Sequence, residues 1–139
     1  MRVFVTGGTG AIGAHAVPAL IAAGHSVTAL ARSDAKAAVP RGQGAVPVSV
    51  SLFDRRGLAD AFAGHDAVVN LASALPSTTA FIRKSAWTEC ERVRSEGSAT
   101  VVDAARDADD KTFGFRPFGI LLQPAHYMPD HRLSFHNIN

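Results

Sequence analysis

The chain has 139 residues, of which 47% are hydrophobic and 19% charged, and its formal net charge is +2. This length suits one domain with a single substantial core, and this composition excludes a chain that is disordered throughout. The small charge without a Lys and Arg cluster excludes a nucleic-acid-binding surface, and no apolar stretch approaches the roughly 18 residues of a membrane span.

Short apolar segments alternate with helical patterns along residues 1–110. In chain order, we expect a strand over 2–6, a helix over 11–23, strands over 26–31 and 46–50, a helix over 56–63, a strand over 66–71 and a helix over about 89–105. Pro18 falls inside the first helix, where it removes a backbone donor and should bend the helix. Apolar strands that are each followed by a helix predict a parallel sheet buried on both faces, which is an α/β architecture.

The pattern changes after Asp110. We therefore expect an α/β domain over residues 1–110 and an atypical tail over residues 111–139. Residues 113–115 are the candidate for a fifth strand. Beyond Arg116 neither a helical nor a strand period is found, and the spacing of the prolines discourages long elements.

Side chains that bind metals or form disulfides are few or badly spaced. His126, His131 and His136 recur every five residues, a period that fits neither a helix face nor a strand face, so we predict no metal site. The single cysteine, Cys90, excludes an internal disulfide and suits a reducing compartment. We therefore expect a cytoplasmic protein.

A glycine-rich segment joins the first predicted strand to the first predicted helix. Gly7, Gly10 and Gly13 form the spacing G-x-x-G-x-x-G, which allows a tight turn, a close approach of backbone to a pyrophosphate and close helix–strand packing. The backbone N–H groups of Ala11 and Ile12, at the start of the helix, would face the phosphates. The segment therefore predicts binding of a dinucleotide.

The same residues carry a resemblance to a known family. TGGTGAIG at 6–13 resembles the T-G-x-x-G-x-x-G signature of extended short-chain dehydrogenases/reductases, which include the NAD-dependent epimerases/dehydratases. Further segments resemble the family's successive motifs over about residues 1–106: GHSVTALAR, SLFD, LADAFAGHDAVVNLA and EGSATVVDAA. The resemblance implies a Rossmann-type, doubly wound parallel sheet of about five strands, truncated relative to the family, with residues 1–110 as the NAD(P)-binding domain.

The resemblance also implies which residues contact the cofactor. Arg32 follows the second strand, where an arginine accommodates the 2′-phosphate of NADP, so NADP is favoured over NAD. The alternatives are a solvated arginine without a ligand and an arginine that pairs with Asp34. Ser51 and Leu52 stand at the adenine contact, where the family usually has Asp and an apolar residue. The segment beside the cofactor ribose comprises Leu71, Ala72 and Ser73.

Catalytic residues of the family are not found in this sequence. Hydride transfer there relies on a Tyr-x-x-x-Lys pair, whereas the single tyrosine here, Tyr127, is followed four positions later by His131. The resemblance implies an NAD(P)-dependent oxidoreductase or epimerase acting on a small carbonyl, hydroxyl or sugar-nucleotide substrate. The alternative is a non-catalytic dinucleotide-binding module or a truncated remnant, produced by a shifted reading frame or an early stop. An uncovered sheet edge would favour a homo-oligomer.

Overall fold

A parallel five-stranded sheet organises the protein, and the computed structural model describes residues 1–74, 84–110 and 119–122 of it. The strands are β1 (Arg2–Thr6), β2 (Ser26–Leu30), β3 (Val46–Val48), β4 (Ala67–Asn70) and β5 (Gly119–Leu122). The helices are α1 (Gly13–Ala22), α2 (Asp34–Gly42), α3 (Arg55–Phe62), α4 (Thr88–Arg92) and α5 (Ser98–Asp110), with a short 3₁₀ turn η1 (Lys84–Trp87) and a π-helical turn η2 (Val93–Gly97). The Rossmann-type α/β fold expected from the sequence is therefore confirmed.

The strand order β3-β2-β1-β4-β5 reverses direction at β1. Val3 of β1 pairs with Val27 of β2 on one side and with Ala67 of β4 on the other. In parallel sheets of this kind, a ligand binds outside the carboxyl ends of the strands at the point where the order reverses. The fold thus directs attention to the loops that follow Thr6 and Asn70.

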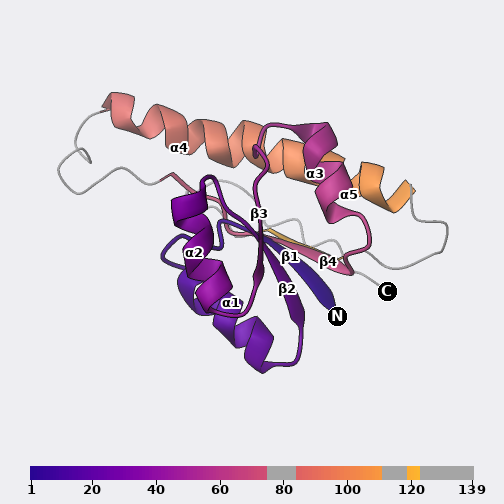
Figure 1. Cartoon of the computed structure of the whole chain (residues 1–139). Helices are drawn as coiled ribbons and strands as arrows, with labels where there is room; N and C mark the ends of the chain where they lie inside the picture. Colours follow the sequence, from indigo (N-terminus) through magenta and orange to yellow (C-terminus); the bar gives the residue numbers. More distant parts are fainter. Residues whose placement is uncertain (75–83, 111–118, 123–139) are drawn as a thin grey trace.

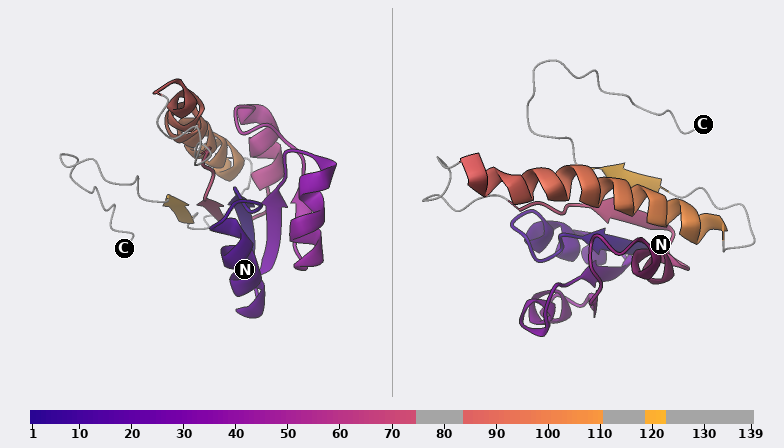
Figure 2. Two further views of the ribbon diagram at one scale, coloured as in Figure 1. Left: turned by 90° about the vertical axis from the view of Figure 1, so that its left-hand side faces the viewer. Right: turned by 90° about the horizontal axis from the view of Figure 1, so that it is seen from above.

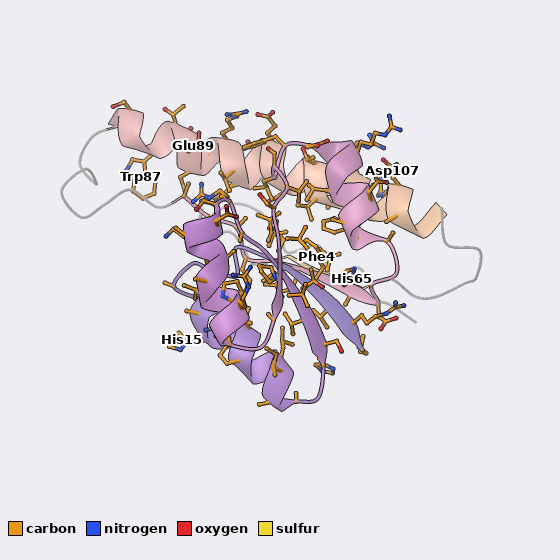
Figure 3. All side chains as sticks on the ribbon, viewed as in Figure 1. Phe4, His15, His65, Trp87, Glu89 and Asp107 are labelled. Atoms are coloured by element: carbon orange, nitrogen blue, oxygen red, sulfur yellow. The ribbon has the colours of Figure 1, made fainter. Side chains whose placement is uncertain are left out.

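Helices cover both faces of the sheet, with α1 and α2 on one face and α3 and α5 on the other (Figures 1 and 2). Alternate residues of β1 supply the two cores, because side chains of a strand point to opposite faces. Val3 and Val5 pack with Val17 of α1. Phe4, which is labelled in Figure 3, packs with Phe62 of α3, and their ring centroids lie 4.8 Å apart.

Three features of the structure differ from what the sequence led us to expect or were not expected at all. Helix α2 was not expected, although Ser33 caps it by accepting a hydrogen bond from the Lys36 N–H at 3.3 Å. The helix expected over 89–105 is interrupted by the π-helical turn. The fifth strand lies at Gly119–Leu122, where no strand period was found, while residues 113–115 lie outside the described part of the chain.

The first helix continues through its proline. Pro18 lies inside α1, which runs from Gly13 to Ala22 as one helix.

None of the helices in the described residues has the length and apolarity that a membrane crossing requires.

Candidate functional site: a cavity at the carboxyl ends of the strands

The glycine loop after β1 is built around close backbone contacts. Gly7 has a φ of 69°, and its carbonyl accepts a hydrogen bond from the Gly10 N–H at 3.0 Å. A Cβ on Gly7 would overlap the backbone carbonyl group of Leu71, and a Cβ on Gly13 would overlap that of Gly7. Both positions therefore require glycine for the fold itself.

Gly10 differs from the other two glycines of the motif. It is exposed, and the protein atom nearest to an added Cβ is the Gly7 carbonyl oxygen at 3.3 Å. Contacts with protein therefore do not forbid a side chain there. Instead, Gly10 lines a cavity, so the absence of a Cβ keeps open the space in which a ligand would meet the backbone.

The amino end of α1 follows directly and carries unpaired donors. Within the described residues, the N–H groups of Ala11, Ile12 and Gly13 donate no hydrogen bond to protein, and no side chain caps the helix. No acidic residue lies in its first turn, so the positive end of the helix dipole is not neutralised there. Such an end binds anions such as phosphate.

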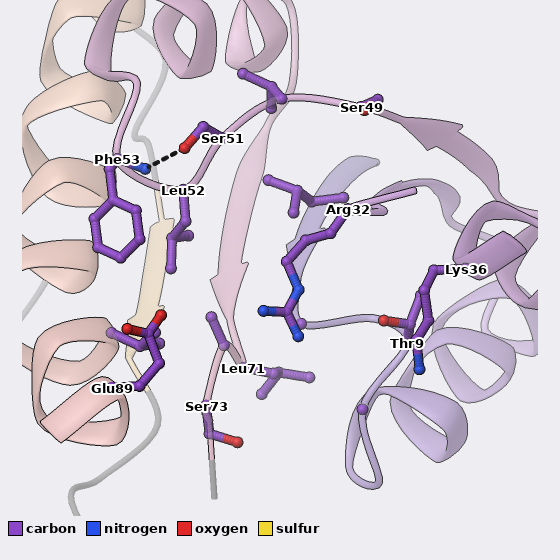
Figure 4. A pocket seen from close by; sticks show the side chains of 16 residues that line it. Thr9, Arg32, Lys36, Ser49, Ser51, Leu52, Phe53, Leu71, Ser73 and Glu89 are labelled. Atoms are coloured by element: carbon purple, nitrogen blue, oxygen red, sulfur yellow. Dashed lines mark hydrogen bonds between the residues drawn. The ribbon is translucent and has the colours of Figure 1, made fainter. Parts of the chain in front are cut away.

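Two cationic side chains reach the cavity from the β2–α2 connection. Arg32 follows the buried Ala31, whose N–H donates to the Val48 carbonyl at 2.9 Å, and Lys36 comes from the first turn of α2. Both are exposed and line the cavity (Figure 4). Among the described residues no ion pair joins Arg32 to Asp34.

The loop after β3 forms a further wall. The Ser51 hydroxyl accepts a hydrogen bond from the Phe53 N–H at 3.2 Å, which tightens the turn (Figure 4). Leu52 is buried against the helix opposite, where a Cβ on Gly97 would lie 2.7 Å from the Leu52 side chain. The guanidinium of Arg92 lies 4.1 Å from the centroid of the Phe53 ring.

A buried asparagine organises the end of β4. The Asn70 side-chain oxygen accepts hydrogen bonds from the Thr6 hydroxyl and, at 3.2 Å, from the Ala72 N–H. Its amide nitrogen donates to the Ser98 hydroxyl at 3.1 Å. Asn70 therefore holds the ends of β1 and β4 and the start of α5 in one arrangement, from which Leu71 and Ser73 line the cavity.

These elements enclose one cavity of about 600 Å³. It brings together the expected residues Gly7, Gly10, Arg32, Ser51, Leu52, Leu71, Ala72 and Ser73. The side chains of Ala11 and Ile12 are exposed and Gly13 is buried beneath the loop, so these three do not line it. The lining residues that were not expected are Thr9, Leu30, Lys36, Ser49, Val50, Phe53, Glu89 and Val93.

A signal existed for three of these. Lys36 lies four positions after Arg32 and would have joined it once a helix beginning after Ser33 was considered. Glu89 and Val93 share the (i, i+4) spacing of one helix face. No group of three or more His, Cys, Asp or Glu side chains in the described residues is arranged to hold a metal ion, and the three tail histidines lie outside those residues.

The residues present fit a dinucleotide. Unpaired backbone N–H groups and the open space at Gly10 suit a pyrophosphate, and the two cations suit a further phosphate group. The apolar side chains of Leu52 and Val93 suit the flat face of a base.

Comparison with known proteins agrees with this geometry. A family model described as NAD(P)H-binding matches residues 7–115. A ketoreductase of Stigmatella aurantiaca that acts on a 4-farnesyl-dihydroquinoline-1-oxide is 41% identical over 108 residues, which cover 78% of this chain and 30% of that protein. A decarboxylating sterol-4-alpha-carboxylate 3-dehydrogenase of Dictyostelium discoideum is 38% identical over 83 residues, which cover 60% of this chain and 25% of that protein.

A solved structure is similar over the same region. The UDP-glucose 4-epimerase of Stenotrophomonas maltophila, solved with bound NAD and formylated UDP-arabinopyranose, matches with a TM-score of 0.63 and 30% identity. The match covers 78% of this chain and 34% of the epimerase. The chain thus spans about a third or less of the length of these three proteins.

Proposed function

The chain belongs to the NAD(P)H-binding family, and from that premise we propose that it binds NADP(H) in the cavity at the carboxyl ends of the strands. In this proposal it forms the nucleotide-binding part of an oxidoreductase or epimerase that acts on a small carbonyl, hydroxyl or sugar-nucleotide substrate. The names of the similar proteins, a ketoreductase, a dehydrogenase and an epimerase, support that class of reaction.

The observation that carries the preference for NADP is the pair of cations on one wall. Arg32 lies between β2 and α2, Lys36 lies in the first turn of α2, and both are exposed and line the cavity. A guanidinium grips phosphate oxygens at two points and an ammonium adds a second positive charge. An acidic residue after β2, which would accept a hydrogen bond from the 2′-hydroxyl of NAD, is replaced by Ala31.

The remaining residues then have defined tasks. Gly10, which lines the cavity, lets the pyrophosphate approach the amino end of α1, where the unpaired N–H groups of Ala11, Ile12 and Gly13 bind it from beside the cavity. Leu52 packs on the adenine. Leu71, Ala72 and Ser73 lie along the ribose toward the reacting end. The cofactor, when bound, supplies the hydride chemistry, and these residues position it.

A second candidate is a dinucleotide-binding module without catalysis. It is favoured by one feature of the sequence: the single tyrosine, Tyr127, has His131 rather than a lysine four positions later. A neutral imidazole is a poor substitute for a lysine that lowers the pKa of a tyrosine.

Titration of the purified chain with NADPH and NADH, followed by a turnover screen, separates the candidates. Tight NADPH binding with reduction of a carbonyl supports the oxidoreductase. Binding without turnover of any substrate in the screen supports the module. Failure to bind either nucleotide contradicts both.

A further inference from the structure

One carboxylate lines the cavity on the wall across from the two cations. Glu89 belongs to α4, and Figure 4 shows its carboxylate beneath the ring of Phe53, on the far side of the cavity from the Arg32 guanidinium. Among the residues lining the cavity, the charged ones are Arg32, Lys36 and Glu89. Within the described residues Glu89 forms no ion pair or side-chain hydrogen bond, so its oxygens are available to a ligand.

The helix fixes where Glu89 points. Cys90, Val93 and Gly97 are buried, which turns this face of the helical stretch toward the core. Glu89 lies one turn before Val93 on the same side, and both line the cavity. Glu91, two positions later, is also exposed but does not line it. Of the two glutamates of α4, Glu89 therefore lines the cavity and Glu91 does not, because the two residues point to different sides of the helix.

The negative charge of the Glu89 carboxylate favours a ligand group that donates a hydrogen bond and disfavours a phosphate at this end of the cavity. A carboxylate has only acceptor oxygens, whereas the exocyclic amino group of adenine presents two N–H donors. The β3 loop offers the neutral Ser51 hydroxyl, which already accepts from the Phe53 N–H. Leu52 and Val93 supply apolar surface beside Glu89, as a base would need.

We propose that Glu89 selects adenine by accepting a hydrogen bond from the exocyclic amino group of the base. The inference rests on the proposed binding of NADP(H), since it assigns the base end of the same cavity. Arg32 and Lys36 then hold the phosphate end of the adenosine, and Glu89 holds its base from the opposite wall.

The test compares NADPH and NADH with their hypoxanthine analogues, in which a carbonyl oxygen replaces the amino group. That oxygen would face the Glu89 carboxylate and repel it. For the full wild-type chain we expect dissociation constants about tenfold weaker for the hypoxanthine form, the value of one hydrogen bond to a charged group. Glu89→Gln should bring the ratio close to one, because a carboxamide accepts from an amino group and donates to a carbonyl.

Glu91→Gln is the matched control, since it removes the same charge from the same helix and should keep the wild-type ratio. Equal binding of both base forms by the wild type, or an unchanged ratio in Glu89→Gln, overturns the role of Glu89 while NADP(H) binding stands. Equal tightening of both forms in Glu89→Gln also overturns it, because it would show simple repulsion of the phosphates. If the wild type binds none of the four nucleotides, the proposed function itself falls.

Discussion

Gln43 donates a hydrogen bond from its side-chain amide to the carbonyl oxygen of Ala14, at 3.0 Å. In a regular helix that carbonyl accepts from the N–H four residues later, which here belongs to Pro18 and does not exist. The side chain that follows α2 therefore supplies the donor that the proline removes from α1. This explains how α1 continues through a proline while α1 and α2 stay attached to each other.

We expect Gln43→Ala to lower the free energy of unfolding by about 1 kcal/mol, the net value of one such hydrogen bond. In a Pro18→Ala background the loss should be smaller, because the backbone N–H that this substitution restores can bond the Ala14 carbonyl itself. Urea denaturation of the wild type, the two single variants and the double variant measures this coupling. Equal losses in both backgrounds would show that Gln43 acts through something other than the proline.

Gly13→Ala tests the packing of the glycine loop. Its Cβ would overlap the Gly7 carbonyl oxygen and lie 2.5 Å from the Gly8 Cα, both backbone atoms that move only with the loop. We expect a loss of about 3 kcal/mol in the free energy of unfolding. Gly42→Ala is the control, because nothing lies within 4 Å of its Cβ. Thermal unfolding should show that variant to be unchanged or slightly stabilised.

Gly10→Ala should separate binding from folding. The added methyl group meets protein only at the Gly7 carbonyl oxygen, at 3.3 Å, so the stability should change by about 1 kcal/mol or less. The methyl group would nevertheless occupy the cavity where a pyrophosphate approaches the backbone. We expect nucleotide affinity to fall about tenfold or more, measured by fluorescence titration. A variant that melts like the wild type and binds with the same affinity would remove Gly10 from the site.

Arg32→Ala should weaken the binding of NADPH by about 10- to 100-fold and change the dissociation constant of NADH by about twofold or less. Lys36→Ala should weaken the binding of NADPH by a smaller factor, since an ammonium group contacts a phosphate less directionally than a guanidinium does. Arg41→Ala, at the far end of the same helix and outside the cavity lining, should bind both nucleotides as the wild type does. Equal losses of affinity for NADPH and NADH in Arg32→Ala would show that Arg32 contacts a part of the nucleotide that both share, and not the 2′-phosphate.

His65 should make the stability depend on pH. Its Nδ1–H donates to the Phe62 carbonyl at 3.3 Å, so its Nε2 accepts from the Thr28 hydroxyl at 2.8 Å, an arrangement of the neutral ring. Burial lowers the pKa of His65 below its ordinary value of 6.5. As the pH falls below that value, the unfolded chain takes up the proton first, so the free energy of unfolding decreases toward the folded-state pKa.

Denaturation curves between about pH 7.5 and 5.5, a range that spans the ordinary histidine pKa, check this expectation. His65→Gln should lose that part of the pH slope, and His15→Gln, an exposed position on α1, should keep it. A slope that is the same in all three proteins would assign the pH dependence to other groups.

The parts of the fold that could be predicted are those encoded by local patterns. The runs VFV before Thr6 and AVV after Asp66 are apolar, as buried parallel strands require, and the positions of these strands are confirmed. Helix α2 was missed because its sequence, DAKAAVPRG, has a single large aliphatic side chain and a proline near its end. Strand β5 was missed because four residues of GILL, set among prolines and aromatic residues, carry no distinctive period.

The site could be predicted only in part for a different reason. Gly7, Gly10 and Arg32 stand at fixed offsets from single strands, and a motif can find them. Lys36 has a local signal once a helix after Ser33 is considered, whereas Glu89 reaches the cavity only through the order in which the strands pair and the phase of its helix. That information is spread over the whole domain and is not contained in any short segment.

The turn at Gly7 packs against the backbone of Leu71. The strands that lead into these two residues are joined by the hydrogen bond between Thr6 and Asn70, and these two residues lie 64 positions apart in the chain. A ribosome adding about 5–20 residues per second therefore releases the glycine loop several seconds before its packing partner exists. The last wall, at Val93, emerges later still. If the chain binds its nucleotide as proposed, we expect a nascent chain to do so only after α4 has left the exit tunnel, when the strands β1–β4 have already been released.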